Sequence, residues 1–181
     1  MGPSRIAATF SIIGACLLFS TCSALPNRNP AGQIFPKVDG ESLTGKNVSL
    51  PGDLPKEKLL LLVGYRHKTQ FDIDRWMLGL GMAKLTVPIY ELPTLPGMAA
   101  KLFSGRIDNS MRAGIPRPDW SAVITIYGDD AETIARMTGT ERPKNARAIL
   151  LDTNRKIIWF HDQGYSPRVL LELKAFLERG K

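Results

Sequence analysis

Residues 59–65 read LLLLVGY, a continuous apolar run directly after the charged tripeptide KEK. A short run of this kind, bounded by charged and turn residues, is typical of a strand buried on both faces of a sheet. Residues 146–151 (ARAILL) and 122–127 (AVITIY) show a similar pattern. We therefore expect these runs to form the centre of a sheet that is covered on both faces.

Outward from these runs, apolar residues recur at helical spacing and predict helices between the strands. The clearest stretch is 69–84, in which Trp76 is expected to lie in the core. Thr69, followed by Asp72, resembles a capping box at its start. Further helices are predicted at 97–103, from Asp129 or Asp130 to Met137, and after the helix-start pair Ser166-Pro167.

The remaining strands are expected in two hairpins and one single segment. Residues 34–50 predict two short strands with a turn at Asp39-Gly40, and 146–160 predict two more around a turn in which Asn154 is left-handed. Residues 87–92 form the single strand, and 104–120 are expected to be irregular. This alternation predicts the α/β class, with a mixed sheet and helices on both faces.

Both cysteines of the chain, Cys16 and Cys22, lie in its N-terminal segment. A positive charge at Arg5, an uncharged apolar stretch and a small-residue exit form the pattern of a secretory signal. The apolar stretch is shorter than the roughly 20 residues of a spanning helix. Two processing schemes stay open: cleavage before Leu25 by an ordinary signal peptidase, or lipidation of Cys16 or Cys22, for which the segment resembles a bacterial lipoprotein signal.

The predicted organisation is a signal at 1–24, a linker rich in Pro, Asn and Gly at 25–33, and one domain at 34–181. After loss of the signal, 23 basic and 17 acidic side chains remain, a net charge of +6 without any thiol. No disulfide can then staple the domain. The basic residues are spread along the chain, so nucleic-acid binding is not expected, whereas a position near an anionic membrane is compatible with the charge.

The stretch from Phe35 to Tyr65 resembles the opening of peroxiredoxins and periplasmic thiol oxidoreductases, which have a thioredoxin-like fold. Residues 127–140 (YGDDAETIARMTGT) and 145–160 (NARAILLDTNRKIIWF) resemble the later part of the alkyl hydroperoxide reductase pattern. In those enzymes the reactive cysteine follows the central strand. This chain has Arg66-His67-Lys68-Thr69-Gln70 at that place, so the resemblance implies the fold without its thiol chemistry.

A second resemblance is to the mitochondrial assembly-factor family that helps build subunit a into the F-type ATP synthase, and to its bacterial relatives. It rests on Phe35-Pro36 with Gly40 and Leu43, on 90–93 (YELP), and on 151–159 with Gly164. This resemblance implies a cysteine-poor thioredoxin-like domain that assists assembly at a membrane without catalysis.

Seven residues are candidates for a partner surface or cleft: Arg66, His67, Thr69, Glu91, Trp120, Trp159 and His161. None is assigned as catalytic. With two histidines and no cysteine in the domain, an ordinary zinc site is not expected, and neither is another metal or a cofactor.

Four of these candidates keep alternatives. His67 is expected to act as an acid–base group or metal ligand, or to be an exposed polar residue at a helix start. Glu91 is expected either to be buried and paired with an arginine or to mark the exposed end of a strand. His161 is expected to pair with Asp162, to line a cleft or to lie at a surface strand end. Trp120 is expected on a partner surface or on a lid over the core.

The sequence favours a non-catalytic thioredoxin-like interaction protein that is exported and helps a membrane or envelope complex to assemble. It is expected in the periplasm or at the outer face of the inner membrane, with a lipid anchor as one option. One alternative is an enzyme that uses His67, Thr69 and Glu91 in the cleft of the fold. Another is a redox-associated protein whose thiol comes from a partner.

Overall fold

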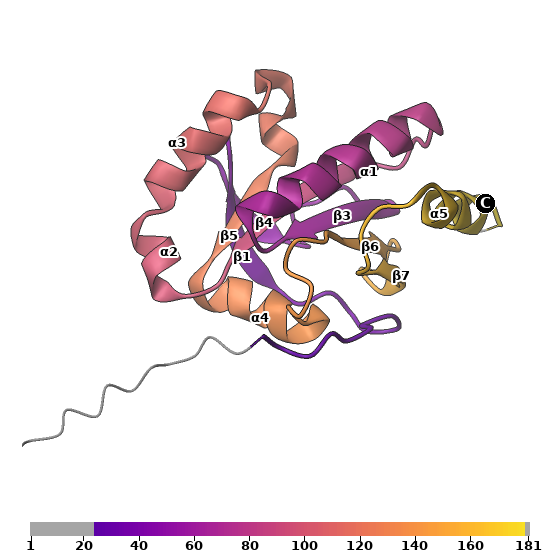
Figure 1. The fold of residues 1–181 in the computed structure, drawn as a ribbon, viewed down its shortest axis with the longest axis horizontal. Helices are drawn as coiled ribbons and strands as arrows, with labels where there is room; N and C mark the ends of the chain where they lie inside the picture. Colours follow the sequence, from indigo (N-terminus) through magenta and orange to yellow (C-terminus); the bar gives the residue numbers. More distant parts are fainter. Residues whose placement is uncertain (1–23, 180–181) are drawn as a thin grey trace, which may run out of the picture.

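The computed structural model describes residues 24–179, and Figure 1 shows a twisted sheet with helices around it. The sheet has the strand order β2-β1-β5-β4-β3-β6-β7. Its strands are β1 (Val38–Ser42), β2 (Asn47–Leu50), β3 (Leu59–Gly64), β4 (Ile89–Leu95), β5 (Ile124–Tyr127), β6 (Arg147–Leu151) and β7 (Ile157–His161). The helices are α1 (Gln70–Met82), α2 (Met98–Leu102), α3 (Ser104–Gly114), α4 (Gly128–Thr138) and α5 (Pro167–Arg179), with 3-10 turns η1 (His67–Thr69) and η2 (Arg117–Ala122).

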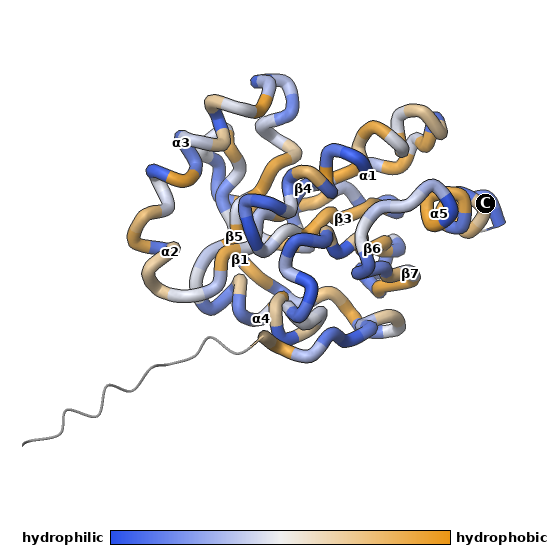
Figure 2. The backbone as a smooth tube through the Cα atoms, viewed as in Figure 1, coloured by the Kyte–Doolittle hydropathy of each residue, from blue (hydrophilic) through white to orange (hydrophobic). Residues whose placement is uncertain are grey.

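Strand β3 lies inside the sheet, parallel to β4 and antiparallel to β6. Every residue of β3 and of β6 is buried, and Figure 2 shows the apolar character of β3 at the centre of the molecule. Since β4 also pairs in parallel with β5, while β1 and β7 pair antiparallel to their neighbours, the sheet is mixed. The predicted buried strands and the predicted α/β class are confirmed.

Alternate side chains of β3 enter two separate hydrophobic clusters, one on each face of the sheet. On one face, Leu60 and Leu62 pack with Trp76 of α1 and Leu173 of α5. On the other face, Leu59, Leu61 and Val63 pack with helix α4, for example with Ile134. Helices therefore cover both faces, as the alternation of elements predicts.

Three local expectations were wrong. The turn expected at Asp39-Gly40 is not there: these residues pair with Ser49 and Val48 inside the β-ladder, and the first hairpin turns after Ser42. A side chain at position 40 would collide with Ile124, so glycine there serves close packing against β5 and not a turn.

In the second hairpin the left-handed residue is Arg155, with φ of 66°, and not Asn154. Asp152 Oδ1 instead accepts hydrogen bonds from the backbone N–H of Asn154 and of Lys156. Residues 104–120, expected to be irregular, form α3 and most of η2. The polar composition of α3, in which only Asp108 is buried, and the glycines Gly105 and Gly114 near its ends hide the helix.

Residues 25–33, the expected linker, run along the domain. The N–H of Thr140 donates to the carbonyl of Leu25, the N–H of Leu25 donates to the Thr140 hydroxyl, and the N–H of Arg28 donates to the carbonyl of Thr138. Of the predicted signal at 1–24, all but Ala24 lies outside the described residues, including Cys16 and Cys22. No helix in residues 24–179 is long and apolar enough to cross a membrane.

We predict that Leu61→Ala lowers the free energy of unfolding by roughly 2–5 kcal/mol, because it opens a cavity in the middle of β3. Leu61 is fully buried, and urea denaturation of the purified protein measures the change. Leu171→Ala is the matched control, since Leu171 is 62% exposed on α5 and its truncation should change stability little. Equal effects of the two substitutions would contradict the assigned position of β3.

Candidate functional site

The candidate site lies where β3 ends and α1 begins, at residues 65–70. Arg66, His67 and Lys68 are exposed, whereas Thr69 is buried. The Thr69 hydroxyl donates to the carbonyl of Pro143 at 2.8 Å and accepts the N–H of Arg66 at 3.2 Å. Thr69 therefore ties α1 to the loop 139–146, and the capping contact with Asp72 expected from the sequence is not made.

The buried Arg147 holds the loop 139–146, which also accepts the hydrogen bond of Thr69. Arg147 is charged, yet it has no exposed surface because it lies in the buried strand β6. Its Nη1 donates to the carbonyls of Arg142 at 2.6 Å and Asn145 at 2.7 Å, and its Nη2 donates to the carbonyl of Gly139 at 3.0 Å. Its guanidinium also lies over the Tyr65 ring, 5.0 Å from the centroid. Burial lowers the pKa of Arg147, so these carbonyls and the ring are what hold its charge inside the domain.

Asp72 fastens the same region from α1, a role that sequence reasoning missed. Its carboxylate is buried and accepts the N–H of Ala146 and the N–H of Tyr165, both at 2.9 Å. Arg75 pairs with it at 2.7 Å. A carboxylate near a helix start is ordinarily an exposed charge that favours the helix dipole, so nothing in the sequence distinguishes Asp72 from Asp74. Arg147 did carry a signal, since it is a charge inside an otherwise apolar strand.

Glu91 lies in β4 beside Leu62 of β3, on the face that α1 covers. Its Oε1 is buried without a hydrogen-bond partner, and no ion pair involves it among the described residues. Burial raises the pKa of the Glu91 carboxyl to about 7. The negative charge of Asp74 raises this pKa further, whereas a hydrogen bond with Gln70 lowers it. The expected arginine partner is therefore not found.

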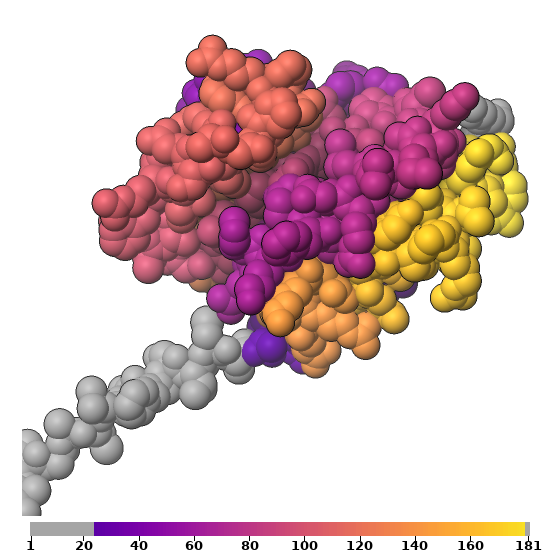
Figure 3. Space-filling view, turned by 45° about the horizontal axis from the view of Figure 1, so that its top comes forward, coloured from indigo at the N-terminus to yellow at the C-terminus, as the bar shows by residue number. Residues whose placement is uncertain are grey.

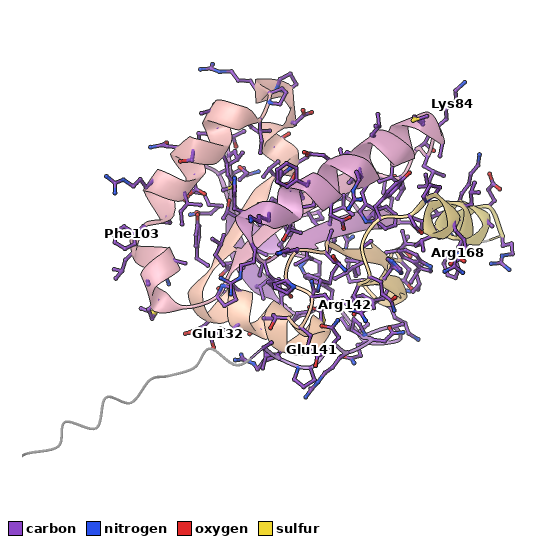
Figure 4. The ribbon with its side chains drawn as sticks, in the orientation of Figure 1. Lys84, Phe103, Glu132, Glu141, Arg142 and Arg168 are labelled. Carbon is purple, nitrogen blue, oxygen red and sulfur yellow. The ribbon has the colours of Figure 1, made fainter. Side chains whose placement is uncertain are left out.

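The surface near α1 is hollowed. Figure 3 shows a groove between α1 and the α2–α3 arm. Phe103 and Ile107, which line a shallow open pocket on this arm, are apolar. That pocket lies on the arm itself, since all of its lining residues belong to 103–110, and Figure 4 shows Phe103 on the side of the arm away from α1.

The other candidates lie elsewhere. His161 and Trp159 stack with centroids 6.0 Å apart, and both contact Trp76, which is fully buried as expected. His161 Nε2 is hydrogen-bonded to the carbonyl of Gly164 at 2.8 Å, so its role is to hold the turn before α5 and not to pair with Asp162.

Trp120 belongs to η2. Its indole N–H donates to the carbonyl of Ile115 at 2.9 Å, and Arg117 lies over its ring at 5.3 Å. Trp120 thus closes the loop between α3 and β5. The structure brings together Arg66, His67 and Thr69, places Glu91 beside the first turn of α1, and separates these four from Trp120, Trp159 and His161.

This arrangement does not assemble a nucleophile with its base. Both sides of the Thr69 hydroxyl are used by backbone groups, and no hydrogen bond joins it to His67 among the described residues. Covalent catalysis needs a base within hydrogen-bond reach of the nucleophile. The turn is built as a rigid surface with three exposed side chains.

By sequence, neither a protein-family model nor a curated protein matches this chain. By structure, it is similar to yeast Sco1 with copper bound, with a TM-score of 0.58 and 10% identity over 83% of this chain and 94% of that one. It is also similar to a SCO1/SenC family lipoprotein from Bacillus anthracis, with a TM-score of 0.54 and 12% identity over 83% of this chain and 98% of that one. A thio-disulfide isomerase from Thermus thermophilus matches with a TM-score of 0.52 and 16% identity, over 83% and 96% of the two chains.

The fold is thioredoxin-like. At these identities the likeness concerns the fold alone, and it agrees with the fold that the resemblance to peroxiredoxins and thiol oxidoreductases implies. In this thioredoxin-like chain the place that the resemblance assigns to a reactive cysteine is the turn 66–70. A backbone-bonded threonine and exposed basic side chains occupy it.

We predict that the stability of the domain falls as the pH rises from about 4.5 to about 7, because of Glu91. The carboxyl has an ordinary pKa of 4.5 in the unfolded chain and about 7 in the folded one. Over this window the unfolded state releases a proton that the folded state keeps, which favours unfolding by up to roughly 3 kcal/mol. Glu91→Gln should remove this loss and be the more stable protein at pH 8.

Urea denaturation at pH 5 and pH 8 measures this difference for the wild type and the variant. Glu178→Gln is the control, since Glu178 is exposed on α5 and its neutralisation should leave the pH dependence as in the wild type. A Glu91→Gln variant that follows the wild-type pH profile would show that Glu91 is solvated in the folded state.

Proposed function

We propose that this chain is a non-catalytic thioredoxin-like interaction protein that is exported and assists the assembly of a membrane or envelope complex. The observation that carries the proposal is the β3–α1 turn. At the position where the fold places thiol chemistry, Thr69 is used to lock α1 onto loop 139–146, and Arg66, His67 and Lys68 face solvent. Such a turn can contact a partner but offers no activated nucleophile.

The cysteine distribution supports the same conclusion. Residues 24–181 contain no cysteine, because both cysteines stand at 16 and 22. Thiol–disulfide exchange begins with a thiolate, so the domain itself cannot carry it out. A redox-associated role would need the thiol of a partner.

The likeness to Sco1 raises copper carriage as a further role, and the described residues do not fit it. Copper(I) favours soft thiolate and thioether ligands together with imidazole. The domain has no thiolate, and no group of three or more His, Cys, Asp or Glu side chains in residues 24–179 is placed to hold a metal ion. His67 and His161 also lie on different parts of the fold, since His161 belongs to the cluster around Trp76.

The second candidate function is a cysteine-independent enzyme, and Glu91 is the observation that favours it. A carboxyl with a pKa near 7 is poised for proton transfer at neutral pH. A buried carboxyl with a raised pKa is equally expected where the carboxyl binds a cation supplied by a partner. We place the binding function first because His67 and Thr69 do not converge on Glu91 through any hydrogen bond among the described residues.

Export belongs to the proposal, with the N-terminal segment as the signal, and the anchoring form of it makes Cys16 or Cys22 the acceptor of a lipid, in which case cleavage before Leu25 does not occur. We predict that labelling with radioactive palmitate marks the full-length chain, and that Cys22→Ser or Cys16→Ser, whichever removes the acceptor, abolishes the label. Retention of label in both single variants but not in the double variant would show two acceptors. Absence of label in the wild type would leave export by ordinary signal peptidase.

The assembly role predicts that cells without this chain accumulate an incomplete membrane complex, visible on native gels of detergent-solubilised membranes. Re-expression of the full-length chain should restore the complete complex. The purified domain, residues 25–181, should match blanks in insulin reduction and peroxide consumption. Native gels that do not change on deletion would overturn the assembly role, and turnover that survives repurification would overturn the non-catalytic one.

A further inference from the structure

Three segments that are far apart in the sequence meet at one end of the domain, and all three expose basic side chains there. They are residues 24–28, the turn 65–69 and the loop 138–147. Thr69 bonds to Pro143, the N–H of Arg28 to Thr138, and Arg147 to Arg142. Figure 3 shows these segments side by side. We call their exposed cations the basic end: Arg28, Arg66, Lys68, Arg142 and Lys144.

The charges of the basic end are not neutralised by the domain. None of the five takes part in an ion pair among the described residues, whereas Arg75, Arg112, Arg136 and Arg168 all do. The one acidic residue of the three segments is Glu141, which accepts the N–H of Asn27. Figure 4 shows Arg142 and Glu141 on this loop, and Figure 2 shows the loop as strongly hydrophilic.

An exposed aromatic side chain borders the basic end. Phe71, in the first turn of α1, is 71% exposed, and it follows Lys68 by three residues. A large apolar side chain next to unpaired cations is the combination by which a peripheral protein inserts into the headgroup region of an anionic bilayer while its cations contact the lipid phosphates.

The place where the N-terminal segment joins the domain is at this same end. Leu25 is bonded to Thr140 of the loop 138–147, and the uncharged apolar stretch 6–20 precedes it in the sequence. Where Cys16 or Cys22 carries a lipid, the few residues between that cysteine and Leu25 keep the basic end close to the lipid, because a chain of n residues spans at most about 3.5 Å per residue.

From these observations we infer that the basic end, with Phe71, is a docking surface for an anionic phospholipid membrane. The membrane would then meet the domain at the β3–α1 turn, and the groove beside α1 would open along the bilayer, toward subunits embedded in it. This inference goes beyond the proposed function and does not depend on which complex is assembled. It also differs from lipidation, because it assigns the affinity to side chains of the folded domain.

The test uses the domain, residues 25–181, which contains all residues of the two hydrophobic clusters and therefore the whole described core. Binding is measured by sedimentation with vesicles of phosphatidylcholine alone and with vesicles that contain phosphatidylglycerol. We expect binding to the anionic vesicles only, and release of the domain by high salt.

Two triple variants with the same change in net charge separate a local surface from general charge. Arg66→Glu, Lys68→Glu and Lys144→Glu alter the basic end, and Lys37→Glu, Lys46→Glu and Lys156→Glu alter exposed lysines elsewhere. Since each basic residue near an anionic surface contributes on the order of fivefold to binding, the first variant should bind at least 100-fold more weakly. The second should change binding far less, and Phe71→Ser should weaken it several-fold.

Circular dichroism of each variant confirms that it is folded. Equal losses in the two triple variants would show attraction by net charge and overturn the inference. Failure of the wild-type domain to bind anionic vesicles would also overturn it, and would point to an acidic protein as the ligand of the basic end. Either failure would leave the assembly role intact, because that role is measured on native gels.

Discussion

The enclosed guanidinium of Arg147 is the constraint on which the functional end of this domain depends. A charge in a central strand is tolerated only if polar groups replace its hydration. Here the carbonyls of Gly139, Arg142 and Asn145 and the ring of Tyr65 do so. The loop 139–146, between α4 and β6, folds around the Arg147 side chain so that its carbonyls can accept these hydrogen bonds.

The same loop decides what the β3–α1 turn can do. Because its Pro143 carbonyl takes the hydroxyl of Thr69, and its Ala146 N–H is held by Asp72, the first turn of α1 is bonded to the loop at two points. In a thiol enzyme the start of this helix activates a sulfur anion. In this chain the side chains of Thr69 and Asp72 hold the start of the helix to the loop, and Arg66, His67 and Lys68 are exposed.

Glu91 adds a second property to this end of the molecule. Its buried oxygen lacks a hydrogen-bond partner, and the pKa of its carboxyl lies near 7. An unpaired buried polar group reduces stability, and such groups persist in proteins mostly where binding or proton transfer uses them. A cation or hydrogen-bond donor that reached Glu91 beside Gln70 would therefore remove the cost of its buried, unpaired oxygen.

The sequence by itself determined the sheet. A strand buried on both faces is a continuous apolar run in the sequence, so β3, β5 and β6 can be recognised from their residues alone. The start of α5 is likewise recognised from Ser166-Pro167. It also determined the absence of a thiol from the domain, which follows from the positions of Cys16 and Cys22 alone. Helix α3 escaped prediction because it is mainly polar, with one buried residue, and because Gly105, Gly114 and Pro116 in and after it are typical of irregular chain.

Only the tertiary structure decided which polar residues serve the site. Thr69, Asp72 and Arg147 are bonded to groups between 70 and 80 residues away or across a loop, and such pairings leave no local pattern. The basic end was equally invisible, since its cations are spread from Arg28 to Lys144 in the chain and appear as scattered charges. Burial of side chains within one segment shapes each strand, whereas the site is made by residues that are distant in the sequence and leave no local pattern.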